Sequence, residues 1–178
     1  MQEIEAKILE IDRRKVEDTL AKIGAVKAFD GKIETFFYDF RDGSIIKAKN
    51  VMRLRSENKH FVLTYKKVKR GEQAKKAEEY SIVVSDLVTA QKILESLGLI
   101  VVDSTQKHRI SYELERVHFD IDRYFGKYGY IPELLEIEAD SVKSIHKYAK
   151  ALGFKAKDCL AWSTVQVIEY YSRMKVKQ

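Results

Sequence analysis

Hydrophobic and polar residues alternate along the first stretch of the chain, residues 3–8. The odd positions are charged and the even positions are apolar, so a strand places the two kinds on opposite faces. Six later stretches follow the same pattern. The polar positions of the seven stretches are Glu3/Glu5/Lys7, Arg53/Arg55, Thr64/Lys66, Glu79/Ser81, Lys107/Arg109, Asp120/Asp122 and Glu136/Glu138. For any one of them, the simplest interpretation is a half-buried strand whose charges face water.

Amphipathic helices are predicted between these strands. Three begin at a capping side chain and end at a glycine, namely Asp12 to Gly24, Asp86 to Gly98, and Asp140 or Ser141 to Gly153. The apolar face predicted for the second helix consists of Leu87, Ala90, Ile93, Leu94 and Leu97. A last helix is expected from about Ser163, because residues 163–166 have the form of a capping box.

The remaining segments are predicted as strands, turns and loops. Residues 25–40 are extended and rich in aromatic residues, with a break near Asp30 and Gly31, and residues 41–44 form a turn. Residues 51–55 and 61–66 form a hairpin. Further strands are predicted over 78–84, 99–113, 117–123 and 134–138, a mobile loop over 67–76, and a second loop over 126–130.

A repeat underlies this order. The sequence of residues 3–7, Glu-Ile-Glu-Ala-Lys, recurs at 136–140 as Glu-Ile-Glu-Ala-Asp, and each copy precedes a helix with a similar end. A fainter copy runs from residue 79 to residue 99. The sequence therefore predicts an internally symmetric chain, and no linker divides it.

The helices decide where the charged strand faces point. Each helix must bury an apolar face, and the apolar faces of the strands are where it would dock. Seven strands with the same pattern then turn their charges away from the helices, into the lumen of a closed or nearly closed sheet. Since buried charges are costly without partners, such a lumen is expected to be wet or to bind a charged ligand.

Composition narrows the class of ligand. The chain has 178 residues and a formal net charge of +6, which favours polyanionic partners. No apolar run is long enough to span a membrane, and the charged start is unlike a signal peptide. The single Cys159 excludes an internal disulfide and favours a cytoplasmic protein, and the four histidines lack zinc-ligand spacing.

The predicted lumen combines two kinds of charged group. Lysine and arginine side chains suit phosphate oxygens, and carboxylates suit Mg²⁺ or Mn²⁺. The cations are Lys7, Arg53, Arg55, Lys66, Lys107 and Arg109, and the carboxylates are Glu3, Glu5, Glu136, Glu138 and an aspartate. Together they favour a metal-bound polyphosphate as the ligand.

In this order, the motifs resemble the CYTH superfamily, the triphosphate tunnel metalloenzymes. These include class IV adenylate cyclases, thiamine triphosphatases and inorganic triphosphatases. The matching motifs are Glu3-x-Glu5-x-Lys7, Arg53-Leu-Arg55, Thr64-x-Lys66, Lys107-x-Arg109, Asp122-Arg123 and Glu136-x-Glu138. The resemblance covers nearly the whole chain. It implies an α+β fold in which a closed eight-stranded antiparallel β-barrel forms a tunnel with a charged lumen and outer helices, as one domain over residues 1–178.

The resemblance also implies roles for the site residues. Lys7, Arg53, Arg55, Lys66, Lys107 and Arg109 would bind phosphates, and Glu3, Glu5, Asp122, Glu136 and Glu138 would bind one or two divalent metals, directly or through water. The family usually has an arginine near an acidic pair in the fifth strand, where this chain has residues 75–80. There Glu79 is taken as a tunnel acid and Lys75 as a basic substitute. Asp120 shares the predicted face of Asp122 and is a further tunnel acid.

The function expected from this resemblance is metal-dependent hydrolysis of a small-molecule triphosphate. Glu5 or Glu138 would orient the attacking water, and Lys66 is placed with the catalytic residues. One alternative is a class IV adenylate cyclase that makes cyclic AMP and pyrophosphate, and a second is a non-catalytic barrel that binds polyphosphate or RNA. The aromatic residues near Phe36 lie away from the basic strands, so nucleic acid is not the expected partner. A monomer or homodimer without a membrane partner is expected.

Overall fold

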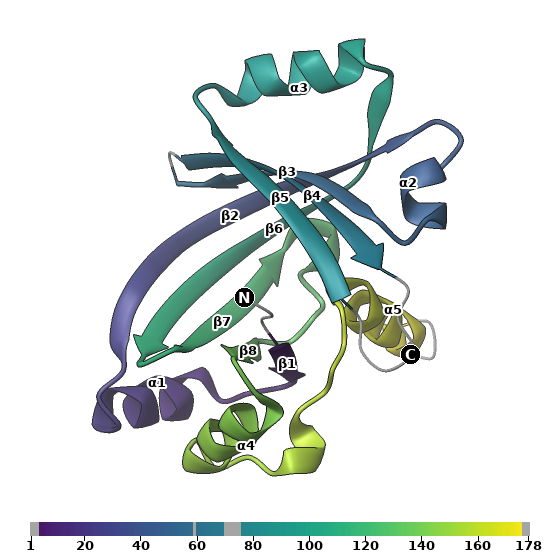
Figure 1. Cartoon of the computed structure of the whole chain (residues 1–178). Coiled ribbons are helices and arrows are strands. Elements are labelled where there is room, and N and C mark those ends of the chain that lie inside the picture. Colours follow the sequence, from purple (N-terminus) through teal and green to yellow (C-terminus); the bar gives the residue numbers. More distant parts are fainter. Residues whose placement is uncertain (1–3, 59, 70–75, 176–178) are drawn as a thin grey trace. The chain divides into compact units, whose positions relative to one another are not determined.

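The computed structural model describes residues 4–58, 60–69 and 76–175 (Figure 1). The predictions for Glu3, for Lys75 and for residues 70–75 of the loop therefore lie outside the described residues, whereas residues 67–69 and 76, also predicted as loop, belong to strands. The strands are β1 (Ile4–Ile8), β2 (Val26–Phe40), β3 (Val51–Glu57), β4 (His60–Lys69), β5 (Lys76–Val84), β6 (Leu99–Leu114), β7 (Val117–Phe125) and β8 (Leu134–Ala139). The helices are α1 (Arg13–Lys22), α2 (Ser44–Lys47), α3 (Leu87–Ser96), α4 (Val142–Ala151) and α5 (Thr164–Lys175), with short 3₁₀ turns η1 (Gly126–Tyr128) and η2 (Ala156–Asp158).

The eight strands form one antiparallel sheet in the order β1-β8-β7-β6-β2-β3-β4-β5. The predicted eight-stranded antiparallel sheet with helices is therefore confirmed, whereas its closure into a tunnel stays a prediction. The chain divides into two compact units. Unit 1 contains residues 1–31 and 107–178, and unit 2 contains residues 32–106, so the long strands β2 and β6 contribute to both. The prediction of a single domain stays a prediction.

In unit 1, helices α1 and α4 pack on one face of the sheet. Val16 and Leu20 of α1 and Ile145 and Ala149 of α4 share one buried cluster with Phe119 of β7 and neighbouring strand residues. Every strand side chain in this cluster comes from the apolar positions of the alternating pattern. The charged positions of β1, β7 and β8 therefore lie on the other face, as the pattern predicts.

Unit 2 repeats this arrangement with one long helix. Ala90 and Leu94 of α3 pack with Tyr38 of β2 and Leu54 of β3, and Ile45 of α2 joins the same cluster. Arg53 and Arg55 alternate with Leu54 along β3 and so point away from α3.

The three predicted helix starts and stops have nearly the same geometry. Asp12, Asp86 and Ser141 each accept a hydrogen bond from the backbone N–H three residues later. Gly24, Gly98 and Gly153 follow the helices with φ values of 86°, 88° and 89°, a conformation that glycine adopts without a Cβ penalty. The capping box at Ser163 is also present, since the Gln166 side chain accepts from Ser163 N and Ser163 Oγ accepts from Gln166 N.

Two further local predictions were wrong, and one short helix was not predicted. Strand β2 continues through Asp30 and Gly31 without a break. The turn predicted over 41–44 is present, closed by a hydrogen bond from Gly43 N to Phe40 O, but it leads into the unpredicted α2, where the buried Asp39 carboxylate accepts from the N–H groups of Ile45 and Ile46. The predicted apolar face of α3 is only partly buried, since the residues at its positions 93 and 97 are exposed. No helix within the described ranges combines the length and apolar character that crossing a membrane requires.

Candidate functional site

The charged face of unit 1 is assembled by strand register. Glu5 of β1 lies opposite Glu138 of β8, and Lys7 lies opposite Glu136. Glu136 in turn lies opposite Asp120 of β7. Directly opposed residues on neighbouring strands point to the same side, so the register brings charged residues from three strands together.

Asp122 holds two cations from β6. Lys107 Nζ donates to Asp122 Oδ2 at 2.6 Å, and Arg109 donates from Nε and Nη2 to the two Asp122 oxygens at 2.7 Å each. The Asp122 side chain is only 1% exposed. Both of its oxygens are therefore occupied by cations, and the fork-to-fork pairing with Arg109 fixes the guanidinium plane.

The network continues from Arg109 to the carboxylates of β7 and β8. Arg109 Nη1 pairs with Asp120, whose other oxygen accepts from Ser111 Oγ at 2.6 Å. Arg109 Nη2 lies 3.7 Å from Glu136 Oε2. The buried Lys7 links Glu136 Oε2 at 3.4 Å to Glu5 Oε1 at 3.1 Å. A continuous chain of charges thus connects β6, β7, β8 and β1.

The surroundings of these four carboxyl groups shift their pKa values in different directions. Burial opposes ionisation of Asp122 and Glu136, but the cations beside them prevail and lower the pKa of both groups. Burial, the adjacent Glu136 and a hydrogen bond to it raise the pKa of Glu5. Burial also raises the pKa of Asp120, against the opposing effect of Arg109. Glu136 thus adds to the effect of burial and raises the pKa of both Glu5 and Asp120.

Unit 2 carries a smaller charged cluster on the face opposite α3. Lys66 Nζ lies 2.6 Å from Glu79 Oε2, and Arg53 Nη2 lies 3.7 Å from Glu79 Oε1. The two cations outweigh burial and lower the pKa of Glu79. Glu79 also accepts from Ser81 Oγ at 3.1 Å. The predicted tunnel acid on β5 therefore pairs with two of the predicted phosphate-binding residues.

Arg55 in unit 2 retains unused hydrogen-bonding capacity. Its Nη1 donates to Glu57 at 2.8 Å, whereas its buried Nε has no hydrogen-bond partner among the described residues. A buried guanidinium N–H is costly to leave unpaired, which marks Arg55 as a side chain whose hydrogen bonds are not all satisfied within the described residues.

Each unit thus joins its own predicted site residues. The unit 1 network contains Glu5, Lys7, Lys107, Arg109, Asp120, Asp122 and Glu136. The unit 2 cluster contains Arg53, Lys66 and Glu79. Glu138 lies opposite Glu5 in the register, and Glu3 and Lys75 lie outside the described residues. Within the described part of the chain, no group of three or more His, Cys, Asp or Glu residues is arranged to hold a metal ion.

Side chains that were not predicted as site residues support both charged clusters. Ser111 positions Asp120, and Glu57 positions Arg55. Both extend the alternating pattern by one step, from 107 and 109 to 111 and from 53 and 55 to 57. Tyr124 was also missed. Its buried ring lies 5.8 Å from Lys107 Nζ, within the range of a cation–π contact.

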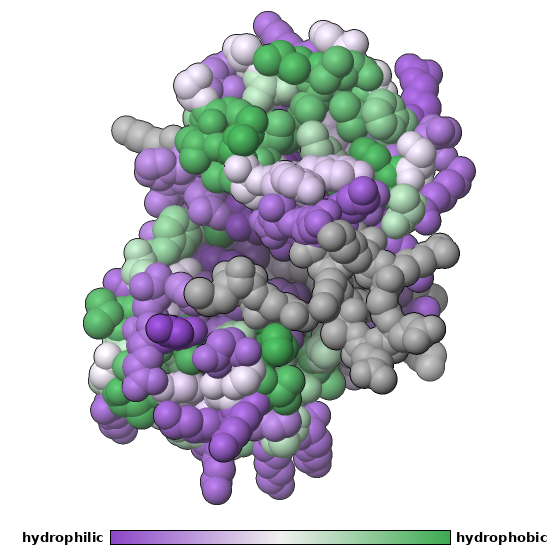
Figure 2. Space-filling view, viewed as in Figure 1, coloured by the Kyte–Doolittle hydropathy of each residue, from purple (hydrophilic) through white to green (hydrophobic). Residues whose placement is uncertain are grey.

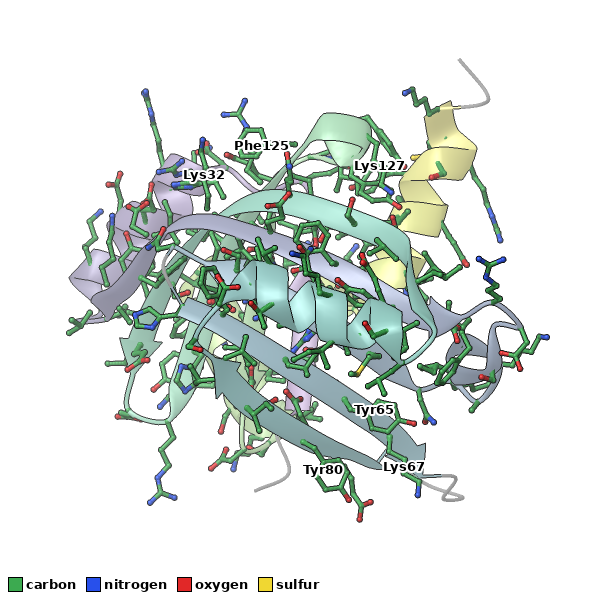
Figure 3. The ribbon with its side chains drawn as sticks, turned by 90° about the horizontal axis from the view of Figure 1, so that it is seen from above. Lys32, Tyr65, Lys67, Tyr80, Phe125 and Lys127 are labelled. Atoms are coloured by element: carbon green, nitrogen blue, oxygen red, sulfur yellow. The ribbon has the colours of Figure 1, made fainter. Side chains whose placement is uncertain are left out.

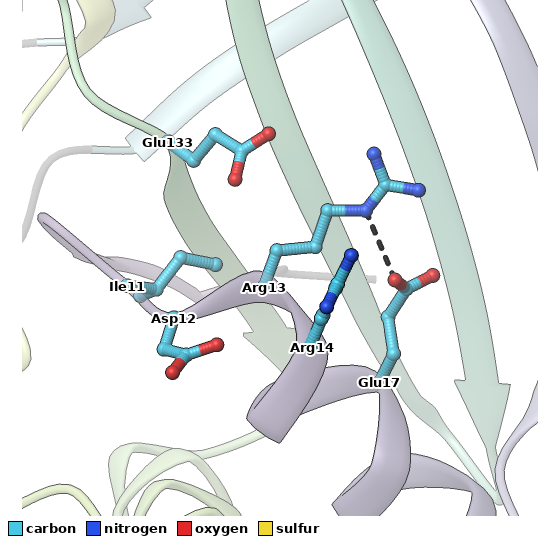
Figure 4. Close-up of a pocket in the computed structure, with 6 residues that line it drawn as sticks. All are labelled: Ile11, Asp12, Arg13, Arg14, Glu17 and Glu133. Carbon is cyan, nitrogen blue, oxygen red and sulfur yellow. Dashed lines mark hydrogen bonds and ion pairs between the residues drawn. The ribbon is translucent and has the colours of Figure 1, made fainter.

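A separate cavity of about 560 Å³ lies in unit 1 at the start of α1 (Figure 4). It is lined by Ile11, Asp12, Arg13, Arg14, Glu17 and Glu133. Asp12 caps α1, and Arg13 Nε donates to Glu17 at 2.9 Å. None of the predicted site residues lines this cavity, and Arg13 and Glu17 pair with each other within it.

Comparisons with known proteins agree with the arrangement of the strands. The curated "Putative adenylate cyclase MJ0240" of Methanocaldococcus jannaschii is 29% identical over 153 residues, which cover 85% of this chain and 84% of that protein. The solved PH1012 protein of Pyrococcus horikoshii is 21% identical with a TM-score of 0.75, covering 93% of this chain and 98% of that one.

A plant protein shares the fold at lower identity. HpAC1 of Hippeastrum, named a "putative adenylyl cyclase" and described as having a dominant triphosphatase activity, is 14% identical with a TM-score of 0.66. The match covers 96% of each chain. At these identities the two solved structures show the fold alone. The CYTH domain family model matches residues 1–161, the part that contains all eight strands and both charged clusters, so the chain belongs to the CYTH domain family.

Proposed function

We propose that this protein is a divalent-metal-dependent triphosphatase that hydrolyses inorganic triphosphate, and nucleoside or other organic triphosphates, with release of phosphate. Members of the CYTH family are enzymes, either triphosphatases or adenylate-cyclase-like proteins. The observation that carries the proposal is the buried ion-pair network of unit 1, in which cations and carboxylates alternate on the sheet face opposite the helices.

The charge balance of this network supports a metal requirement. It contains three cations, Lys7, Lys107 and Arg109, and four carboxylates, Glu5, Asp120, Asp122 and Glu136. A triphosphate brings several further negative charges, and so many unscreened anions in one buried site would repel one another. A divalent cation would offset this repulsion.

Glu5 and Glu136 are the residues that fit such a cation. Their carboxylates are close enough for Glu136 to raise the pKa of Glu5, and a shared cation would relieve that repulsion. Enzymes of the CYTH family typically use divalent metals. Mg²⁺ is commonly held by one or two carboxylates, waters and substrate phosphates, so a larger protein cage is not needed. Mg²⁺ or Mn²⁺ bound there would neutralise charge on the phosphates.

The chain's own residues perform the remaining tasks. In the proposed mechanism, Lys7, Lys107 and Arg109 bind phosphate oxygens, and Asp122 keeps Lys107 and Arg109 in position. Phosphoryl transfer depends mainly on such positioning and charge stabilisation. Glu5 or Glu138 orients the water that attacks the terminal phosphorus. The proposal includes a closed tunnel in which Arg53, Arg55 and Lys66 bind phosphates of the same substrate.

Adenylate cyclase activity is the second candidate, because the Methanocaldococcus relative is named for it. In that reaction the ribose 3′-hydroxyl attacks the α-phosphorus and pyrophosphate leaves. Hydrolysis is preferred because it requires only the charged site, whereas cyclisation also requires a site that orients the nucleoside.

The deciding experiment supplies inorganic triphosphate, ATP and thiamine triphosphate, each with Mg²⁺ or Mn²⁺, and measures phosphate, pyrophosphate and cyclic AMP. Phosphate released only when the metal is present is the expected result. Cyclic AMP formed with equimolar pyrophosphate would instead establish the cyclase. Binding without turnover of any of the three would indicate a non-catalytic polyphosphate-binding protein.

Glu5→Gln and Glu138→Gln test the roles of the two carboxylates. At least one of them should lower kcat by about 10²–10³-fold, the typical effect of removing one transition-state contact, while triphosphate still binds. Turnover is followed by phosphate release and binding by calorimetry. Wild-type turnover in both variants would contradict the mechanism.

A further inference from the structure

Helix α3 of unit 2 exposes apolar side chains where α1 and α4 of unit 1 expose mostly charged ones. Ile93 is 55% exposed and Leu97, at its C-terminal end, is 66% exposed, and Val88 is also more than half exposed. The exposed positions of α1 are mostly charged, among them Arg14, Lys15 and Asp18. Those of α4 include Lys143, Lys147 and Lys150. A helix that is apolar on more than one side normally has a second surface to pack against.

The sheet beneath α3 is also only partly covered. In unit 1, two long helices, α1 and α4, share one buried cluster on the helix-bearing face. Among the described residues of unit 2, α3 is the only helix longer than a single turn. A helix is about 10–12 Å wide and strands lie about 4.8 Å apart, so one helix covers roughly two strands. The buried partners of α3, Tyr38 and Leu54, lie on β2 and β3.

The uncovered part of this face lies on β4 and β5. Tyr65 lies opposite Tyr80, and Leu63 lies opposite Ile82, so these four side chains point to the same side. Leu63 and Tyr65 reach the edge of the α3 cluster, whereas Tyr80 is 59% and Ile82 60% exposed. We call these four residues the β4–β5 strip. Seen from above, Tyr65 and Tyr80 lie beside α3, not beneath it (Figure 3).

We propose that the β4–β5 strip and the exposed apolar residues of α3 form the interface of a homodimer. In a twofold arrangement, α3 of one copy packs on the β4–β5 strip of the partner copy, and the partner's helix packs reciprocally. One surface then supplies both an apolar helix ridge and an apolar strip, which is the self-complementarity that a twofold interface requires. In unit 1, the second helix on the sheet comes from the same chain. In unit 2, the partner copy supplies this second helix.

The extent of the surface fits this occupant. A stable interface buries about 800 Å² per partner. The exposed portions of Tyr80, Ile82, Ile93 and Leu97 supply part of that area. In the space-filling view, apolar residues gather over the part of the molecule that contains α3 (Figure 2). A contiguous exposed apolar patch that is large usually marks an interaction site.

The test measures the mass of the full chain in solution by light scattering coupled to size-exclusion chromatography, over a range of protein concentrations. The wild type is expected to have twice the mass of the 20.7 kDa chain. Leu97→Glu on α3 and Ile82→Lys on β5 should each shift the protein to the monomer, because each places a charge in the apolar interface. Both side chains are exposed within one copy, so far-UV circular dichroism should be unchanged.

A matched control is Val142→Lys on α4, which likewise places a charge at an exposed apolar position but lies in unit 1. This variant should remain a dimer. A wild type with the mass of one chain at every concentration would overturn the proposal. A dimer that persists in both folded interface variants would overturn it as well, since another surface would then hold the copies together.

Discussion

At the scale of single residues, Asp122 is the centre of the unit 1 network. Its carboxylate accepts hydrogen bonds from Lys107 Nζ and from Nε and Nη2 of Arg109, and its side chain is almost completely buried. Buried ion pairs seldom add stability over an apolar core, but the loss of one partner leaves an uncompensated charge. Asp122 therefore serves to hold two cations in fixed positions, and the network depends on it for its integrity.

Asp122→Asn should lower the free energy of unfolding by about 3–5 kcal/mol at neutral pH, because two buried cations lose their main counter-charge. Urea denaturation followed by circular dichroism measures this loss. Glu113→Gln is the control, since Glu113 is exposed on the neighbouring strand β6 and should change stability by less than about 0.5 kcal/mol. A loss below about 1 kcal/mol for Asp122→Asn would show that neighbouring carboxylates compensate.

The same variant has a predictable pH dependence. The native pKa of Asp122 is lowered, so its stabilising effect is fully present above the unfolded value of about 3.9 and is lost as the pH falls through the native value. The stability difference between wild type and Asp122→Asn should therefore shrink below about pH 4. A difference that stays constant from neutral pH to about pH 3 would contradict this assignment.

At the scale of elements, the chain uses one strand–helix–glycine design three times. The helices α1, α3 and α4 each contain ten residues, and each is followed by a glycine with φ between 86° and 89°. The ends of α1 and α4 also share a backbone hydrogen bond, from Ala25 N to Leu20 O and from Phe154 N to Ala149 O. These shared ends support the internal symmetry that the repeated sequence indicates.

Gly98→Ala tests the importance of the helix stop. A Cβ at this position meets no atom within 4 Å, so the expected cost is the left-handed backbone alone, about 1–2 kcal/mol. Thermal or urea unfolding measures the change. Gly98→Asn should cost less, because asparagine tolerates this conformation better. Equal stability of Gly98→Ala and wild type would mean that the chain relaxes to a different helix end.

At the scale of the whole molecule, both charged clusters are proposed to bind the same triphosphate. Unit 1 supplies more carboxylates than cations, which suits the metal. Unit 2 supplies Arg53, Arg55 and Lys66 with Glu57 and Glu79, which leaves a small positive excess for phosphate. Binding stoichiometry tests the proposal that one triphosphate engages both clusters.

Arg55→Gln should weaken the binding of inorganic triphosphate by roughly ten- to a hundredfold, the effect of losing one charged hydrogen bond. Titration calorimetry in the presence of Mg²⁺ measures the affinity and should give one site per chain. Lys67→Gln is the matched control, because Lys67 follows Lys66 on β4 and points to the opposite face. Unchanged affinity in Arg55→Gln, or two sites per chain, would contradict a shared ligand.

The sequence by itself determined the elements and the side to which their charges point, because both follow from local rules. Alternation places Lys107 and Arg109 on one face of a strand, and Asp12, Asp86 and Gly98 mark helix ends by the chemistry of their own side chains and backbone. Tertiary structure alone decided the partners. Lys7 pairs with Glu136 because the register joins β1 to β8, which are distant in sequence. Asp122 holds Lys107 and Arg109, and Glu79 holds Lys66, because the register of consecutive strands places them side by side. It also decided that Ile93 and Leu97 stay exposed, since the width of a sheet relative to the helix above it is not encoded in any local pattern.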